Sequence, residues 1–313
     1  MLSPFLAVLA ALANALASAL QRKAAREEST EENLSPRLVW HLLHRPVWFA
    51  GVLSLIAGFL LQAVALGSGQ ISEVQPLLAL DLPAALILSG LFFGSRLGRR
   101  EWGASVVMAA GVAGLLLALD PGHGTPSAVS WTGWLIGAGA NVLLIAAGVL
   151  WARRTSGTRR AAVLGAATGC AFGLTAALIK GVTTRYSQGL SAVFTGWQLW
   201  AMIAVGACAM FLLQSAMNAG GLLATQPGLT MTDPVIGILW GVLVFHEQVR
   251  GGPFIVLAVL CAAAAATAVM VLSRSPLLSD AADEEDEQKE RREGKADRDG
   301  HDAKGTARPE NDR

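Results

Sequence analysis

Nine apolar runs, each about twenty residues long, limit how this chain can fold. A helix of about 20 residues rises about 30 Å and crosses the hydrocarbon core of a bilayer, whereas a soluble core needs no runs of that length. Apolar residues make up 53% of the 313 residues, and the mean hydropathy is +0.49. We therefore predict an all-α integral membrane protein with spans at residues 2–20, 47–66, 71–93, 102–119, 131–152, 161–182, 192–217, 222–245 and 254–272.

Two stretches of the chain, residues 59–102 and 211–253, resemble each other. Each contains an apolar span, a short Gly-rich turn, a second apolar span with two prolines, and a charged exit. Internal repeats of this kind are typical of transporter folds, whose substrate site lies where the repeats meet. The matched residues include Gln62 with Gln214, Gln75 with Gln226, Pro83 with Pro234, and Arg99 with Arg250.

The distribution of Lys and Arg predicts the orientation. The connectors after spans one, three and five carry twelve of these residues, and the connectors after the even-numbered spans carry three. Cytoplasmic loops carry the excess of positive charge, so the N-terminus is expected outside and the C-terminal tail inside the bacterial cytoplasmic membrane. In this orientation the two repeats, about residues 1–120 and 131–273, are inverted relative to each other.

The chain divides into a transmembrane domain, residues 1–278, and a charged tail, residues 279–313. The tail holds 8 basic and 13 acidic residues without apolar periodicity, so we expect it to be disordered. A proline after a serine at the start of segment 34–45 predicts a short helix lying in the membrane interface. No clustered basic face indicates nucleic-acid binding. The expected partners are the lipid bilayer and a small solute or ion, and a homodimer is left open.

The candidate site residues are polar groups inside the spans. Asp81 and Asp233 fall near mid-depth, where a charged side chain costs about 2.5–3.5 kcal/mol, so each is a functional candidate. Each precedes the second proline of its span, which leaves a backbone carbonyl without its usual donor. The alternative is that the protonated aspartates only bond neighbouring helices. Four glutamines that recur in both repeats either bind substrate or tie helices together: Gln62, Gln75, Gln214 and Gln226.

Helical spacing refines this expectation. Gln226 and Asp233 are seven residues apart and share a helix face, whereas Gln75 and Asp81 are six apart and about 120° off. We therefore predict that Asp81, Asp233 and Gln226 line one central cavity, which Gln75 need not do. Lys180, near the outer end of span six, is expected to extend its ammonium group to the interface.

Glycines at four-residue intervals predict close helix packing in span six, at residues 165, 169 and 173. No nucleotide-binding loop, HExxH or GxSxG motif is present, so we expect neither an enzyme nor a cofactor. The pair His246-Glu247 lacks further ligands at helical spacing and does not indicate a metal site.

Over residues 2–273 the pattern resembles the drug/metabolite transporter superfamily, the EamA-like fold. The resemblance implies ten helices in two inverted five-helix repeats, of which the first helix is missing here. The proline-containing fourth helices correspond to residues 73–101 and 224–250, and the Gly-rich fifth helices to 103–119 and 254–272. The usual glutamate of the charged exit is kept at Glu247, whereas Ser95-Arg96 stands in the first copy. The nine-span layout, with RPVWFAG and then VQPLLAL, is similar to NIPA-type magnesium transporters.

The expected function is secondary transport of a small polar solute. A NIPA-like Mg²⁺ transporter is the first alternative, because Mg²⁺ keeps several waters and needs only one or two protein carboxylates. Against it, neutral Gln and Asn dominate the polar groups and suit an uncharged or zwitterionic solute. The second alternative is a non-transporting scaffold or sensor that uses its tail to bind a partner.

Overall fold

The computed structural model describes residues 2–26, 46–93, 97–122 and 124–275. Within these ranges the chain is helical and contains no strand. Nine stretches of the described residues are long and apolar enough to cross a membrane, and they correspond to the nine predicted spans. The elements are α1 (Leu2–Arg26), α3 (Pro46–Ser68), α4 (Ile71–Leu78), α5 (Asp81–Phe93), α6 (Arg99–Leu119), η1 (Pro126–Ala128), α7 (Trp131–Ala152), α8 (Gly157–Tyr186), α9 (Leu190–Thr195), α10 (Trp197–Leu239), η2 (Trp240–Val244) and α11 (Pro253–Leu272).

The predicted interfacial segment, residues 34–45, and the tail, residues 279–313, lie outside the described residues. So does Ser95-Arg96 at the charged exit of the first repeat.

Large apolar side chains cover the outside of the bundle. Leu91, Leu117, Ile136, Leu143 and Phe211 are each more than 70% exposed. In water such a surface would cost about 25 cal/mol for each Å² of apolar area, whereas lipid tails solvate it. These exposed faces, together with the nine apolar helices, indicate a multi-pass membrane protein.

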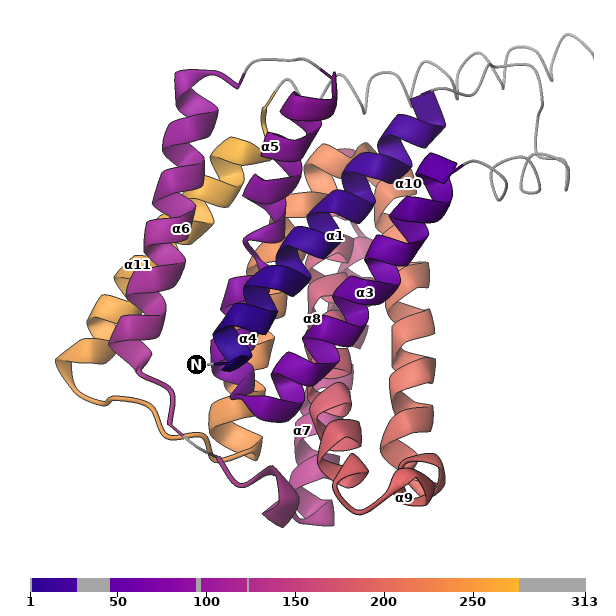
Figure 1. The fold of residues 1–313 in the computed structure, drawn as a ribbon, viewed down its shortest axis with the longest axis vertical. Helices are drawn as coiled ribbons and strands as arrows, with labels where there is room; N and C mark the ends of the chain where they lie inside the picture. The colour runs from indigo at the N-terminus through magenta and orange to yellow at the C-terminus, as the bar shows by residue number, and fades with distance from the viewer. Residues whose placement is uncertain (1, 27–45, 94–96, 123, 276–313) are drawn as a thin grey trace, which may run out of the picture.

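Three helix pairs build the bundle: α1 with α3, α8 with α10, and α6 with α11. In Figure 1, α1 and α3 cross in front of α8, and α6 with α11 forms a separate pair at the left. Glycine allows the close approach of α8 to α10, since a Cβ on Gly169 would stand 2.8 Å from the carbonyl oxygen of Leu229. A Cβ on Gly173 would stand 2.7 Å from the Cβ of Ile236. The predicted close packing of the span-six glycines is confirmed.

The helices are broken at two places, one inside span three and one between spans seven and eight. Span three consists of α4 and α5, which are separated at Ala79 and Leu80. Pro83 has no N–H to donate to the carbonyl of Ala79, which weakens a regular helix at this point. Span seven lies in α10, and span eight consists of the rest of α10 with η2. The two spans are separated at Gly220 and Gly221. Gly221 has φ 73°, a left-handed value that favours glycine.

Candidate functional site

Asp81 and Asp233 lie at the same depth in their spans. Each is the eleventh residue of a 22-residue span, Ile71–Phe92 and Leu223–Val244. Asp81 is the first residue of α5, and the backbone N–H groups of Leu82 and Ala84 in this turn donate to the carbonyls of Ala79 and Leu80. Asp233 lies inside α10, directly before Pro234. Both aspartates are half-buried, so neither is sealed from its surroundings.

Gln75 is the direct partner of Asp233. Its Nε2 donates a hydrogen bond of 2.9 Å to Oδ1 of Asp233, which joins α4 to α10. Gln75 is only 1% exposed, and its Oε1 has no hydrogen-bond partner among the described residues. Gly237 makes room for this side chain, since a Cβ there would stand 2.8 Å from the Cβ of Gln75. Each half of the chain therefore supplies one member of this buried polar contact.

The carboxyl group of Asp81 lies near enough to that of Asp233 to interact with it electrostatically. Neither aspartate forms an ion pair with a Lys, Arg or His in the described part of the chain. Two carboxyl groups and the Gln75 amide, from α4, α5 and α10, are thus brought together at mid-depth. In a medium of low dielectric such groups interact strongly with a polar or charged ligand.

No hydrogen bond among the described residues joins the other three predicted glutamines to this cluster. Nε2 of Gln226 donates to Oγ1 of Thr230 at 3.4 Å on the same helix. Gln62 is half-buried and Gln214 is exposed, and no hydrogen bond joins either of them to another described residue. The place of Gln226 in a shared cavity remains a prediction, and the amide that does bond an aspartate is Gln75.

The ammonium group of Lys180 is enclosed by protein at the turn between α3 and α4 and does not extend into solvent. The residue is 6% exposed, and its Nζ donates to the carbonyl of Leu66 at 3.1 Å and to that of Gly69. The helix α8 continues to Tyr186 and does not end at residue 182 as predicted. Lys180 therefore lies six residues, or about 9 Å, from the end of its helix.

Glu247 lies beside this lysine and was missed as a buried group. Its carboxylate stands 3.9 Å from Lys180 Nζ, and it is 3% exposed. It accepts hydrogen bonds from the backbone N–H of Ile71 at 2.8 Å, from that of Ser72 at 3.0 Å, and from the Ser72 hydroxyl. The sequence marks Glu247 only as the glutamate of the charged exit. Nothing in the sequence shows which groups its carboxylate contacts.

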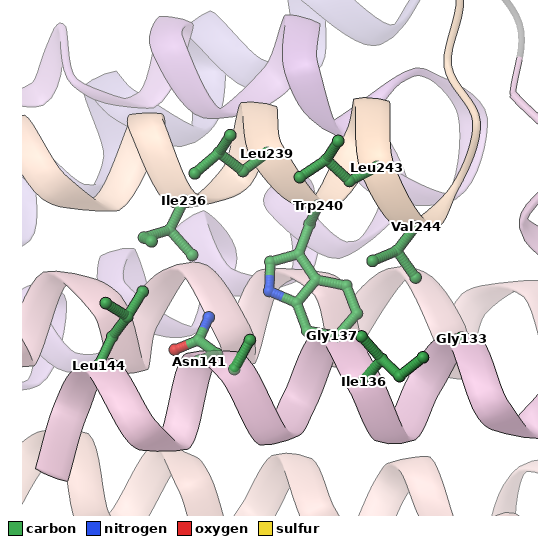
Figure 2. A pocket seen from close by; sticks show the side chains of 11 residues that line it. Gly133, Ile136, Gly137, Asn141, Leu144, Ile236, Leu239, Trp240, Leu243 and Val244 are labelled. Atoms are coloured by element: carbon green, nitrogen blue, oxygen red, sulfur yellow. The ribbon is translucent and has the colours of Figure 1, made fainter.

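A groove of about 310 Å³ lies between α7 and the end of α10 with η2 (Figure 2). Asn141 and Trp240 are its buried polar residues. With the amide of Asn141 suitably oriented, its nitrogen donates to the carbonyl of Cys170 at 3.1 Å and its oxygen accepts from Trp240 Nε1 at 3.0 Å. These groups are therefore satisfied within the protein. The groove is otherwise apolar, and the aspartates do not line it.

The described residues contain no group of three or more His, Cys, Asp or Glu that could hold a metal ion. No family model matches the sequence, and no solved structure matches it. The chain is 31% identical over 206 residues to an uncharacterized protein of Corynebacterium glutamicum, and the match covers 65% of this chain and 70% of that relative. The chain therefore belongs to the same family as this corynebacterial protein.

Proposed function

We propose that the chain is a secondary transporter of the drug/metabolite transporter type, which moves a small polar solute across the cytoplasmic membrane. The observation that carries the proposal is the 2.9 Å contact between Gln75 and Asp233, with Asp81 beside it. This contact joins the two spans that correspond in the sequence repeat. Burying polar groups at mid-depth is costly, and in membrane proteins such groups mark substrate and ion pathways.

The arrangement supports a chemical role for each group. The two carboxyl groups can accept hydrogen bonds from a solute or take up a coupling proton or cation. The Gln75 amide holds the Asp233 carboxyl in one orientation. The break between α4 and α5 lies at the depth of Asp81, and discontinuous helices of this kind form the substrate sites of many secondary transporters. Inverted repeats would then allow the two halves to move around this site.

Flux measurements test the proposal. The full chain is reconstituted in liposomes, and uptake of labelled amino acids, sugars, nucleosides and polyamines is measured under imposed proton and sodium gradients. We expect saturable, gradient-driven uptake of at least one solute. We also expect Gln75→Leu to reduce it at least tenfold, whereas the same change at the exposed Gln214 leaves it unaltered. A current that rises linearly with voltage and never saturates would contradict a carrier.

Mg²⁺ transport is a second candidate, because two neighbouring carboxyl groups meet the minimum that Mg²⁺ requires of a protein. A host deficient in magnesium uptake tests it at limiting magnesium. Rescue by the intact chain, but not by an Asp81→Asn variant that still inserts into the membrane, would favour Mg²⁺ over an organic solute. Deletion of residues 279–313 tests the scaffold alternative, since transport should survive the deletion and partner binding should not.

A further inference from the structure

We infer that Lys180 and Glu247 close one end of the transport path by holding the turn between α3 and α4. This inference rests on the proposed transport function, because a gate has meaning only for a path that must open. We call the two residues the Lys180–Glu247 pair. Their side chains are 8% and 0% exposed, so the pair is enclosed by protein.

The pair satisfies both helix ends that meet at this turn. The last carbonyls of a helix and the first N–H groups of the next have no partners within their helices. The Lys180 ammonium group donates hydrogen bonds to the carbonyls of Leu66 and Gly69. The Glu247 carboxylate accepts hydrogen bonds from the N–H groups at the start of α4. A cation at a helix C-terminus and an anion at a helix N-terminus are both electrostatically favourable.

Glu247 also connects the turn to the end of α10. Its backbone N–H donates to the carbonyl of Gly241 at 2.9 Å, and a Cβ on Gly241 would stand 2.9 Å from Ile71 Cγ2. Gly241 lies in η2, a π-helical segment, and such segments occur frequently at functional sites. The start of α4, the side of α8 and the end of α10 are thus joined through one carboxylate and one ammonium group.

The same two helices carry the candidate site. Gln75 follows Ser72 by three residues on α4, and Asp233 precedes Gly241 by eight residues on α10 and η2. If α4 separates from α8 and η2 at this end, the Gln75–Asp233 contact opens to solvent from the same side. While the Lys180–Glu247 pair is formed, this end of the path stays closed.

The first repeat has no counterpart of the Lys180–Glu247 pair in its sequence. Under the match of Arg99 with Arg250, Ser95-Arg96 stands in the first copy where Glu247 stands in the second. The sequence therefore has no carboxylate at that position of the first copy. The pair should therefore favour the state that is closed at the α3–α4 turn, and loss of its charge should shift the protein toward the state that is open there.

A disulfide across the turn tests whether this end must open. A Cβ on Gly67 would stand 3.1 Å from the Cβ of Thr183, within a few tenths of an ångström of the Cβ separations found in disulfides. In a chain whose three cysteines are changed to alanine, Gly67→Cys with Thr183→Cys should lose at least tenfold of its flux on oxidation and regain it on reduction. Each single cysteine variant should transport normally under both conditions. Unchanged flux with the disulfide formed would overturn the inference.

Thiol labelling tests the pair without any transported solute. Val74 is 0% exposed on α4, between the pair and Gln75, so Val74→Cys reports access from this end. Glu247→Gln should raise its labelling rate by a water-soluble maleimide at least tenfold. Asp120→Asn, which breaks an exposed ion pair with Arg250, is the matched control and should leave the rate unchanged.

A second reporter separates gating from general unfolding. Leu164 on α8 is 4% exposed and distant in sequence from the turn, so Leu164→Cys should label equally slowly with and without Glu247→Gln. Equal rates at Val74→Cys in both backgrounds, or parallel increases at both reporters, would overturn the inference. Selective labelling at Val74→Cys without flux of any solute would show that the Lys180–Glu247 pair controls access to this end of the protein, and it would count against the proposed transport function instead.

Discussion

The contact of α8 with α10 allows a quantitative test through Gly169→Ala. A methyl group at this position would stand 2.8 Å from the carbonyl oxygen of Leu229, 2.9 Å from the Cβ of Thr232 and 3.0 Å from the backbone nitrogen of Asp233. Two of these atoms belong to the backbone, so a side-chain rotation cannot relieve the contact. The two helices must separate by several tenths of an ångström.

The cost can be estimated by comparison with a glycine that has free space. Gly139 on α7 has no atom within 4 Å of the position that a Cβ would take. Alanine stabilises a helix interior by about 0.8–1.0 kcal/mol relative to glycine, and this gain applies to both variants. Overpacking costs about 1–3 kcal/mol and applies only to Gly169→Ala. The two variants should therefore differ by about 1–3 kcal/mol in the free energy of unfolding.

Unfolding in mixed micelles, followed by tryptophan fluorescence, measures this difference. Gly169→Ala should be less stable than Gly139→Ala and should also transport more slowly, because its helix separation displaces Asp233 from Gln75. Equal stability of the two variants would refute the close helix contact. If Gly169→Ala unfolds like Gly139→Ala but transports more slowly, the substitution acts on the candidate site and not on helix packing. That result would also contradict the packing argument.

Two further comparisons use the same assay. Gln75→Leu removes the donor to Asp233 and should lower the free energy of unfolding by about 1–3 kcal/mol. Asp233→Asn keeps an acceptor oxygen and should lower it by less. A larger loss of stability for Asp233→Asn than for Gln75→Leu would contradict the hydrogen bond. Lys180→Met leaves the buried Glu247 carboxylate without its cation and should lower the free energy of unfolding by about 3–5 kcal/mol. Arg250→Gln breaks an exposed ion pair and should lower it by less than about 1 kcal/mol. Equal losses for Lys180→Met and Arg250→Gln would show that the lysine is not buried.

The nine spans could be predicted because apolar length is a local property of the sequence. The interruptions were harder to predict, since similar prolines behave differently. Pro83 lies just after a break in its span, whereas Pro234 lies inside the unbroken part of α10 that follows Gly221. A proline in a membrane helix is tolerated where neighbouring helices compensate for it, and α8 packs on α10 through Gly169 and Gly173 beside Pro234. This compensation is a tertiary contact that the local sequence does not contain.

Helical spacing could relate the site residues only within a continuous helix. The six-residue separation of Gln75 and Asp81 implies an angle of about 120° only if the helix runs unbroken between them. The break at Ala79 and Leu80 removes that condition, so the phase of α4 predicts nothing about the direction of Asp81. The partner that Gln75 does contact, Asp233, is 158 residues away. Sequence matching could indicate that spans three and eight correspond, but not which of their polar groups meet.

Lys180 shows that the interpretation of an ionisable residue in a span depends on where its helix ends. An ionisable group in an apolar span is a functional candidate unless it can reach the interface, and that exception applies only close to a helix end. The polar residues Thr183, Thr184 and Arg185 make span six seem to end early, but α8 continues through all three. The hydroxyl groups of Thr183 and Thr184 bond back to the carbonyl of Lys180 at 3.0 and 2.7 Å, so the helix satisfies them internally. Lys180 is thereby left about 1.7 turns from the end of α8. The buried carboxylate of Glu247 and the carbonyls of Leu66 and Gly69 stabilise its charge there.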